Sequence, residues 1–547
     1  MKRSVLQALA AVAVMSAPSV AAAQAVVIAE GAALHSANGM AFDAFGRLHV
    51  ASVLGSEIVR YSAWNGQVLG RVGRAQGVDG PDDVTFGPDG SLYWTALAAG
   101  QVARRTPGGV TTVQAVAPGT NPITFSSDGR LFVALAFLGD ALYELSPDLT
   151  APPRLIAEGW GFLNGMDFGP DGRLYAPVFT QGRVVSIDVD SCEGATDPYV
   201  ECDVRTVADG FFVPAAAKFD ALRRLHVVDQ SGEVFRVNRF TGDKWVIATL
   251  PPGLDNLAFD PFFNRLIVSS ANDGFVVRLR ADGSARVLSP GGMVAPGGVA
   301  AISGAGGDTL YVADVFTLRA FDGQTGEQVD QTTPFAGQTE LTSPNTVAVD
   351  GANLILSSWF GNAVQVWDPA AKQVIESYSD FAVPINAIRF QGDLVVAELG
   401  FGPGQARVVR QTPAGRVTLA GGLAEPSGLA ASGGDLWFAD RATGAVWQVA
   451  DDGVELPAPA LVAAGLDEPE GLAVDLDGTL LVVESGAGRL SRVDPATGAI
   501  TVVATGLATG LPAITGVPAS YIFSGVTVGS AGDIHVTGDV DNVIYRL

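Results

Sequence analysis

Short apolar runs separated by glycine- and aspartate-rich turns recur along the whole chain. Residues 161–175 show the pattern: a first strand at 165–168, a Gly-Pro-Asp-Gly turn at 169–172, and the apolar start of a second strand at Leu174. An alternating third strand and a valine-rich fourth strand follow in each unit. No comparable stretch keeps the helical period over three turns. The pattern therefore predicts an all-β chain built from four-stranded antiparallel units.

The polar or small residue that opens each unit recurs about every 40 residues, a period typical of propeller blades. Twelve units can be aligned in this way, and propellers usually have four to eight blades. We therefore predict two six-bladed β-propellers, the first at 24–292 and the second at 293–547. The opening residues are Asn38, Asp82, Asn121, Asn164, Ala215, Asp255, Gly297, Asn345, Asn386, Ser427, Glu470 and Ser524.

The two ends of the chain suggest how the rings close. The twelfth unit stops at Leu547 after its third strand, whereas residues 25–30 resemble a fourth strand with no unit before it. Pairing the two would protect both sheet edges. We expect the segment 24–31 to cross over and close the last blade of the second propeller. Separate closure of the two rings, or one ring of twelve blades, are the alternatives.

The N-terminus predicts export. Lys2 and Arg3 precede an apolar run at 5–15 and small residues at 21–23, the pattern of a cleaved signal peptide covering 1–23. We therefore expect a soluble protein that is secreted or periplasmic. No other stretch of about 20 apolar residues occurs, so no membrane span is expected.

The net charge and the cysteine content limit the classes of partner and of catalytic residue that we expect. The formal net charge of −24 opposes binding to nucleic acid and to anionic membranes. The two cysteines, Cys192 and Cys202, lie close together in the sequence, and in an oxidising compartment such a pair predicts a disulfide that closes a loop. A cysteine nucleophile is then not expected.

Three units carry a recognisable blade motif. The segments from Asn38, Asn164 and Glu470 read Asn-Gly-Met-Ala-Phe-Asp, Asn-Gly-Met-Asp-Phe-Gly-Pro-Asp-Gly and Glu-Gly-Leu-Ala-Val-Asp. They resemble the motif of SMP-30/gluconolactonase and NHL-repeat propellers, and more loosely that of paraoxonases and virginiamycin B lyases. The resemblance covers essentially the whole chain after residue 23. It implies a central channel whose mouth holds a divalent cation, commonly calcium, on Asn, Asp and Glu side chains that open the first strands.

The opening positions supply the candidate ligands. Calcium prefers several oxygen ligands, and in the first propeller only Ala215 lacks a side-chain oxygen at this position. Asn and Asp side chains at such positions also cap turns without a metal, so calcium binding and capping both stay open. No organic cofactor is expected. The candidate metal ligands are Asn38, Asp82, Asn121, Asn164 and Asp255, and the second propeller offers Asn345, Asn386 and Glu470.

Two charged residues inside first strands suggest a further contact beside the channel. Asp167 and Lys218 occupy the same position in neighbouring units. This placement predicts an ion pair between them.

Two functions follow from these residues. We expect an exported propeller that binds a small molecule, a glycan or a protein on its faces. The sequence does not identify this ligand. The alternative is a calcium-dependent lactonase or ester hydrolase, in which a cation polarises the substrate carbonyl; the resemblance then gives the catalytic base to Asp82 or Asp255. No glutamate opens a strand in the first propeller, which departs from the SMP-30 pattern. Serine-hydrolase, zinc-protease and Walker motifs are absent from the sequence.

Overall fold

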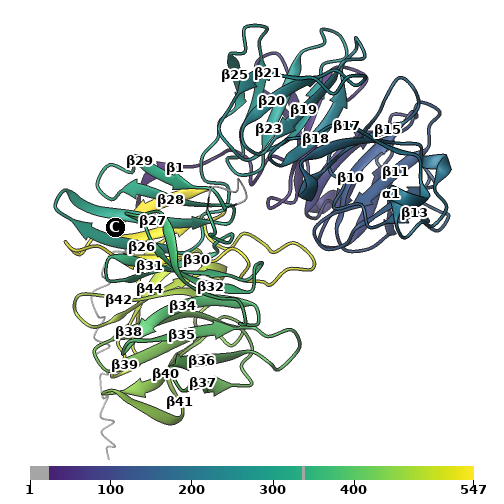
Figure 1. Ribbon diagram of the computed structural model, residues 1–547. Coiled ribbons are helices and arrows are strands. Elements are labelled where there is room, and N and C mark those ends of the chain that lie inside the picture. Colours follow the sequence, from purple (N-terminus) through teal and green to yellow (C-terminus); the bar gives the residue numbers. More distant parts are fainter. Residues whose placement is uncertain (1–23, 335–338) are drawn as a thin grey trace, which may run out of the picture.

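The computed structural model describes residues 24–334 and 339–547, and their regular structure is almost entirely β (Figure 1). The strands form twelve four-stranded antiparallel sheets, which confirms the predicted fold class. The expected signal peptide at 1–23 lies outside the described residues. In the described part of the chain, no helix is both long and apolar enough to cross a membrane.

The first ring contains six sheets whose innermost strands, β2, β6, β10, β14, β18 and β22, lie side by side, with β22 returning to β2. Its strands are β2 (Met40–Phe42), β3 (Arg47–Ser52), β4 (Glu57–Ser62), β5 (Val68–Val72), β6 (Pro81–Phe86), β7 (Leu92–Ala96), β8 (Gln101–Arg105), β9 (Thr111–Ala115), β10 (Thr120–Phe125), β11 (Leu131–Leu135), β12 (Ala141–Leu145), β13 (Arg154–Glu158), β14 (Asp167–Phe168), β15 (Leu174–Val178), β16 (Arg183–Ile187), β17 (Val204–Ala208), β18 (Pro214–Phe219), β19 (Leu225–Asp229), β20 (Glu233–Val237), β21 (Lys244–Thr249), β22 (Leu254–Phe259), β23 (Leu266–Ser270), β24 (Val276–Leu279) and β25 (Ala285–Ser289).

The second ring closes in the same way, because β26, β30, β34, β38, β42 and β46 are neighbours in turn and β46 contacts β26. The predicted boundary at 292/293 falls in the connection between β25 and β26. The strands of this ring are β26 (Val299–Gly304), β27 (Gly307–Asp314), β28 (Thr317–Asp322), β29 (Gln328–Thr332), β30 (Thr346–Asp350), β31 (Asn353–Ser358), β32 (Ala363–Asp368), β33 (Gln373–Tyr378), β34 (Pro384–Phe390), β35 (Asp393–Glu398), β36 (Arg407–Thr412), β37 (Gly415–Gly421), β38 (Pro426–Ser432), β39 (Asp435–Asp440), β40 (Ala445–Asp451), β41 (Val454–Ala464), β42 (Pro469–Val474), β43 (Leu480–Glu484), β44 (Arg489–Val493), β45 (Ile500–Thr505), β46 (Val526–Val528), β47 (Ile534–Gly538) and β48 (Val543–Arg546).

The N-terminal strand β1 (Val26–Glu30) belongs to the second ring. It pairs antiparallel with β48, with Val26 opposite Arg546 and Glu30 opposite Val543. Figure 1 shows β1, in purple, on the second ring although the strands that follow it build the first. The crossover predicted from the two chain ends is therefore confirmed.

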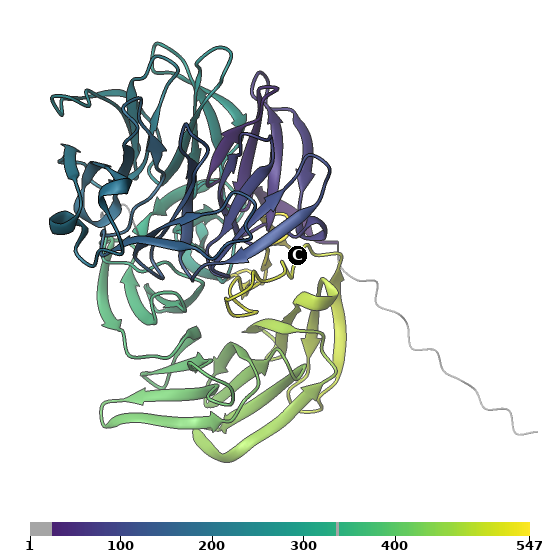
Figure 2. The ribbon, with the colours of Figure 1, turned by 90° about the vertical axis from the view of Figure 1, so that its right-hand side faces the viewer.

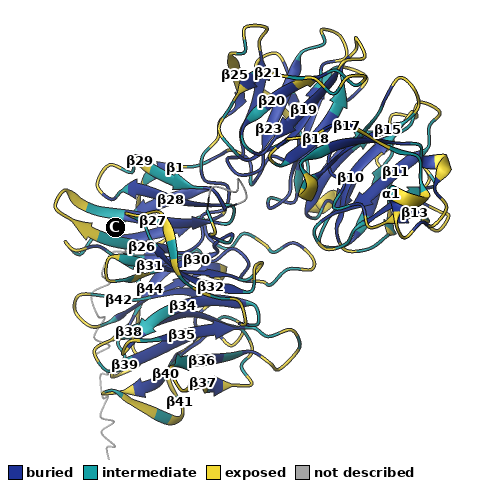
Figure 3. Cartoon of the chain, in the orientation of Figure 1, coloured by how far each residue is buried: buried dark blue, intermediate teal, exposed yellow. Residues whose placement is uncertain are grey.

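Burial follows the position of a strand in its blade. Several second strands, such as β7 and β11, are buried along their whole length, whereas fourth strands such as β9 are half exposed. Figure 3 shows the same contrast between dark blue strands and yellow turns. Apolar side chains of neighbouring sheets fill the space between blades, and Trp94, Trp160 and Trp367 are among the largest that are fully buried.

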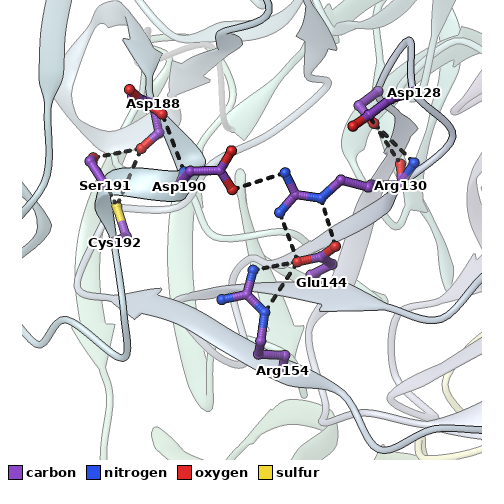
Figure 4. Close-up of polar contacts among 9 residues, drawn as sticks. Asp128, Arg130, Glu144, Arg154, Asp188, Asp190, Ser191 and Cys192 are labelled. Carbon is purple, nitrogen blue, oxygen red and sulfur yellow. Dashed lines mark hydrogen bonds and ion pairs between the residues drawn. The ribbon is translucent and has the colours of Figure 1, made fainter.

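A disulfide joins Cys192 to Cys202, as predicted, in the connection between β16 and β17. The short helix α1 (Pro198–Glu201) lies in this loop. Asp190 reaches the neighbouring blade, where Arg130 donates to its carboxylate at 2.9 Å and to Glu144 at 2.7 Å (Figure 4). The described part of the chain also has 3-10 turns at Arg74–Gln76, Phe179–Gln181, Val189–Ser191 and Ser485–Ala487.

The two rings contact each other through side chains far apart in the sequence. Tyr521 of the second ring donates its hydroxyl to the carbonyl of Leu54 in the first at 3.2 Å, and Arg319 bonds Asp273 across the same boundary at 2.9 Å. Figure 2 shows the last part of the chain, in yellow, reaching between the rings. One mouth of the first ring's channel consequently faces the second ring.

Candidate functional site

The predicted ligand residues of the first ring lie where its inner strands begin, and strand register explains how they leave the sheet. A bulge interrupts the pairing between Pro81 and Val84 in β6, and equivalent shifts occur in β10 and β22. Asp82, Asn121 and Asp255 fall within these irregular segments. Bulges free a side chain from the alternating pattern of a strand and redirect it.

All five predicted ligands of the first ring line one cavity of about 270 Å³ between the rings. Asn38, Asp82, Asn121, Asn164 and Asp255 form its polar wall. The second ring supplies apolar side chains to the same cavity, which the sequence pattern did not reveal because they lie on loops of a different propeller. They include Phe316, Trp359, Phe360 and Tyr521.

The hydrogen bonds show that only some of these five side chains cap the strand that they open. Asn164 caps its own strand, because its Oδ1 accepts from the Gly165 amide at 2.9 Å. Asn38 instead links two blades: its Nδ2 donates to Asp82 Oδ1 at 3.3 Å, while its Oδ1 accepts from the Ser36 hydroxyl at 2.7 Å. Asp255 accepts no hydrogen bond from any residue that the structure describes.

The two carboxylates of the wall are electrostatically coupled. Burial, and then the negative charge of Asp255, raise the pKa of Asp82 well above its usual range. Burial and the charge of Asp83 raise the pKa of Asp255 to about 7, against the opposing charge of Lys218. Close carboxylates in a buried site cannot all ionise without a compensating positive charge.

Asp83 is a residue that the sequence reasoning missed. Its buried carboxylate accepts from the backbone amides of Val84 at 2.9 Å and Ile123 at 3.2 Å, and from Asn256 Nδ2 at 3.3 Å. It therefore ties three blades together behind the cavity wall. Two adjacent aspartates, Asp82 and Asp83, were the sequence signal that could have indicated this role. Nothing in the sequence shows which of the two faces the cavity.

The predicted ion pair between Asp167 and Lys218 does not form as a direct contact. Asp167 Oδ2 accepts instead from the backbone amide of Phe219 at 2.9 Å. The positive charge of Lys218 lowers the pKa of Asp167, Asp83 and Asp255, although burial outweighs it in each case. Lys218 thus acts on three carboxylates of the channel and pairs with none.

The candidates of the second ring do not form an equivalent wall. Asn345 lines the same cavity, but its Oδ1 accepts from the Trp359 amide at 3.0 Å and its Nδ2 donates to the carbonyl of Ile385 at 2.8 Å. Glu470 is buried against Arg441 at 3.1 Å, and burial together with the charge of Asp539 raises its pKa to about 8. Both side chains hold structure around the second channel.

Strand register also moves one opening position. In β6, Phe86 pairs with Leu92, and in β34 the equivalent pair is Arg389 with Leu394. Counting back along both strands places Ile385, not Asn386, at the position of Asp82. Asn386 instead corresponds to Asp83. The predicted opening position was therefore displaced by one residue in this blade.

The donor set of the polar wall consists of two carboxylates and three carboxamides. Within residues 24–334 and 339–547, no group of three or more His, Cys, Asp and Glu side chains is placed to hold a metal ion. A site at this wall would therefore rely on amide oxygens as well as on Asp82 and Asp255. Such hard oxygen donors fit calcium better than a softer metal.

No protein-family model matches the chain, and no curated protein matches it in sequence. Among solved structures it is similar to virginiamycin B lyase from Staphylococcus aureus, with 12% identity and a TM-score of 0.36 over 61% of this chain and 94% of that one. It is also similar to a protein assigned as a gluconolactonase, with 16% identity and a TM-score of 0.37 over 49% of this chain and 94% of that one. An extracellular domain assigned to a one-component system of B. thetaiotaomicron has 12% identity and a TM-score of 0.30 over 94% of this chain and 76% of that one. These values are too low to decide a family or an activity.

Proposed function

We propose that this chain is a double-propeller binding protein that holds a small molecule in the cavity between its rings. The observation that carries this proposal is the joint lining of one cavity by the five polar openings of the first ring and by aromatic side chains of the second. Ligand sites of proteins commonly combine apolar walls with a few placed polar groups. A volume of about 270 Å³ favours a small molecule over a glycan chain or a protein.

A calcium ion at the polar wall is part of this proposal. Asp82 and Asp255 would provide the charged ligands and Asn121 a neutral oxygen, while Asn38, whose Nδ2 donates to Asp82, would hold that carboxylate in place. Support comes from the two buried carboxylates, whose mutual repulsion a divalent cation would relieve. Export of the protein is proposed on the predicted signal peptide, and the disulfide Cys192–Cys202 is compatible with an oxidising compartment.

Calcium binding is tested on the mature protein, residues 24–547, by isothermal titration and by elemental analysis after dialysis. We expect Asp82→Asn together with Asp255→Asn to weaken calcium binding about a hundredfold or more, because both charged ligands become neutral. The matched control is Asp220→Asn with Asp260→Asn, two buried aspartates of the first ring that do not line the cavity. Wild-type protein without calcium affinity at millimolar concentration would refute the cation.

Ligand binding has an independent readout. A small-molecule library is screened by thermal shift, and hits are titrated by the fluorescence of Trp359 and the other tryptophans. Trp359→Ala should weaken a true cavity ligand at least about tenfold, since the variant removes the indole ring that packs against it, while calcium binding is retained. A ligand that binds Trp359→Ala unchanged does not occupy this cavity.

The second candidate function is a calcium-dependent lactonase or ester hydrolase. It is favoured by one observation: two carboxylates face a cavity that has room for a substrate, so one could hold the cation while the other accepts a proton from water. A panel of γ- and δ-lactones and aryl esters, assayed with calcium and with chelator, tests it. Hydrolysis that disappears with chelator and in Asp255→Asn supports an enzyme, and its absence in calcium-loaded protein leaves the binding function.

A further inference from the structure

A groove lined by arginines lies on the first ring, away from the cavity between the rings. It runs over the fifth and sixth blades, whose strands β19, β20 and β23 are labelled in Figure 1, and has a volume of about 740 Å³. Five guanidinium groups line it, although the chain carries a net charge of −24. These arginines are Arg224, Arg236, Arg265, Arg278 and Arg280.

Among the residues that the structure describes, only two of these arginines have a carboxylate partner. Arg224 pairs with Asp220 at 2.6 Å, and Arg265 approaches Asp260 at 3.9 Å. For Arg236, Arg278 and Arg280, no carboxylate of the described chain lies within 4.0 Å. Their positive charges therefore remain available to a ligand.

Arg278 is a buried cation whose hydrogen-bond partners are backbone carbonyls. Its exposed fraction is only 9%, and its guanidinium donates to the carbonyls of Ala63 at 3.2 Å and Trp64 at 3.4 Å. Burial, followed by the positive charges of Arg265 and other nearby arginines, lowers its pKa. A buried cation without an anionic partner is costly for a folded protein, so this position is suited to receive an anion.

His226 adds a hydrogen-bond acceptor to this set of donors. Its Nδ1 lies 3.1 Å from the carbonyl of Arg224, and since a carbonyl can only accept, Nδ1 carries the proton. Burial lowers the pKa of His226 to about 4, so the ring is neutral at pH 7 and its Nε2 is an acceptor. A matching ligand carries hydroxyl donors as well as anionic groups.

Trp64 provides an apolar surface at the rim of the groove. It is 61% exposed, and the guanidinium carbons of Arg265 and Arg278 lie 5.1 and 5.5 Å from its ring centre. Aromatic and guanidinium groups together give broad contact area with directed hydrogen bonds. The groove is also far larger than a single carboxylate or phosphate group requires.

We infer that this groove binds a short acidic oligosaccharide, whose carboxylates pair with the guanidinium groups and whose hydroxyls bond His226. Arginine is suited to carboxylates because its planar fork can form two parallel hydrogen bonds. A long nucleic acid strand is disfavoured, since it would continue from the groove onto a surface of predominantly negative charge.

The experiment uses the mature protein and an oligogalacturonate of defined length as the probe, measured by isothermal titration at low and at high salt. We expect binding that weakens with salt. Arg236→Gln with Arg280→Gln should weaken it about a hundredfold, roughly tenfold for each guanidinium group removed. Both side chains are exposed and lack a carboxylate partner, so the fold should tolerate the change.

The matched control is Arg205→Gln with Lys372→Gln, which removes the same amount of positive charge at exposed positions outside the groove. Both side chains form exposed ion pairs, which contribute little to the stability of the fold. This control should bind the probe within about twofold of wild type, as overall charge alone has a small effect. Equal losses in the two double variants would overturn the site. So would absence of binding, or equal binding of the fully methyl-esterified probe. Tighter binding of polyglutamate or of a single-stranded oligonucleotide at equal charge would overturn the carbohydrate assignment.

Discussion

At the scale of single residues, Asp255 shows how position sets chemistry. A bulge takes it out of the regular pairing of β22 and places it on the cavity wall. Burial and the neighbouring charge of Asp83 then raise its pKa from 3.8 to about 7. An aspartate in an exposed turn of the same blade motif would keep a carboxyl pKa near the usual value for aspartate.

This pKa shift predicts the pH dependence of stability in cation-free protein. Between about pH 4 and pH 7 folded Asp255 keeps a proton that the unfolded chain has lost, so its contribution to stability falls as the pH rises through this window. Asp255→Asn should therefore show a smaller decrease in melting temperature between about pH 5 and pH 8 than wild type. Scanning calorimetry in chelator measures this, and an unchanged decrease would contradict it.

At the scale of elements, the crossover strand β1 closes the second ring. Without it, β48 would present an unpaired edge, and exposed edges promote aggregation. The same segment continues directly into the first ring. Strand β1 therefore has two roles that can be separated: it completes a sheet, and it ties the two rings covalently.

Deleting residues 24–30 should lower the free energy of unfolding by about 3 kcal/mol or more, because the deletion removes a paired strand and its packed apolar side chains. Moving the segment behind Leu547 through a short turn should restore most of this stability, since β1 then follows β48 as the fourth strand follows the third in the other blades. Urea denaturation of both forms tests the prediction. A permuted chain as unstable as the deletion would show that the covalent tie matters more.

At the scale of the whole molecule, a buried ionic cluster links the rings. Arg319 is 1% exposed and bonds Asp314 of its own ring at 2.6 Å and Asp273 of the first ring at 2.9 Å. Its guanidinium also donates to the carbonyl of Asn272 at 2.9 Å. Since Asn272 lines the cavity, this cluster lies next to the proposed ligand site.

Arg319→Met should lower the free energy of unfolding by about 3–5 kcal/mol, because two buried carboxylates lose their partner. Arg407→Met is the control: Arg407 also pairs with a buried acid, Glu398, but is itself 40% exposed and acts within one ring. Urea denaturation should show a clearly smaller loss for the control. Equal losses would contradict a special role for the contact between the rings.

The sequence by itself determined the features that repeat locally. Turn residues and alternating apolar positions recur with each blade, so they predicted twelve units, the closure by β1 and the positions of Asp82, Asn121 and Asp255. The pair Cys192 and Cys202 could be read in the same way, because the two lie in one loop. Local spacing decides these features except the closure by β1, which followed from the missing fourth strand of the last unit.

Only the tertiary structure decided how the repeats face each other. Trp359 meets the polar wall because the second ring packs against the mouth of the first, and the arginine groove gathers Arg224 and Arg278 from different blades. Register placed Ile385 where the alignment had Asn386. Long-range packing fixes such neighbours, and the period of a repeat does not encode it. The blades were therefore predictable, and the surfaces formed between them were not.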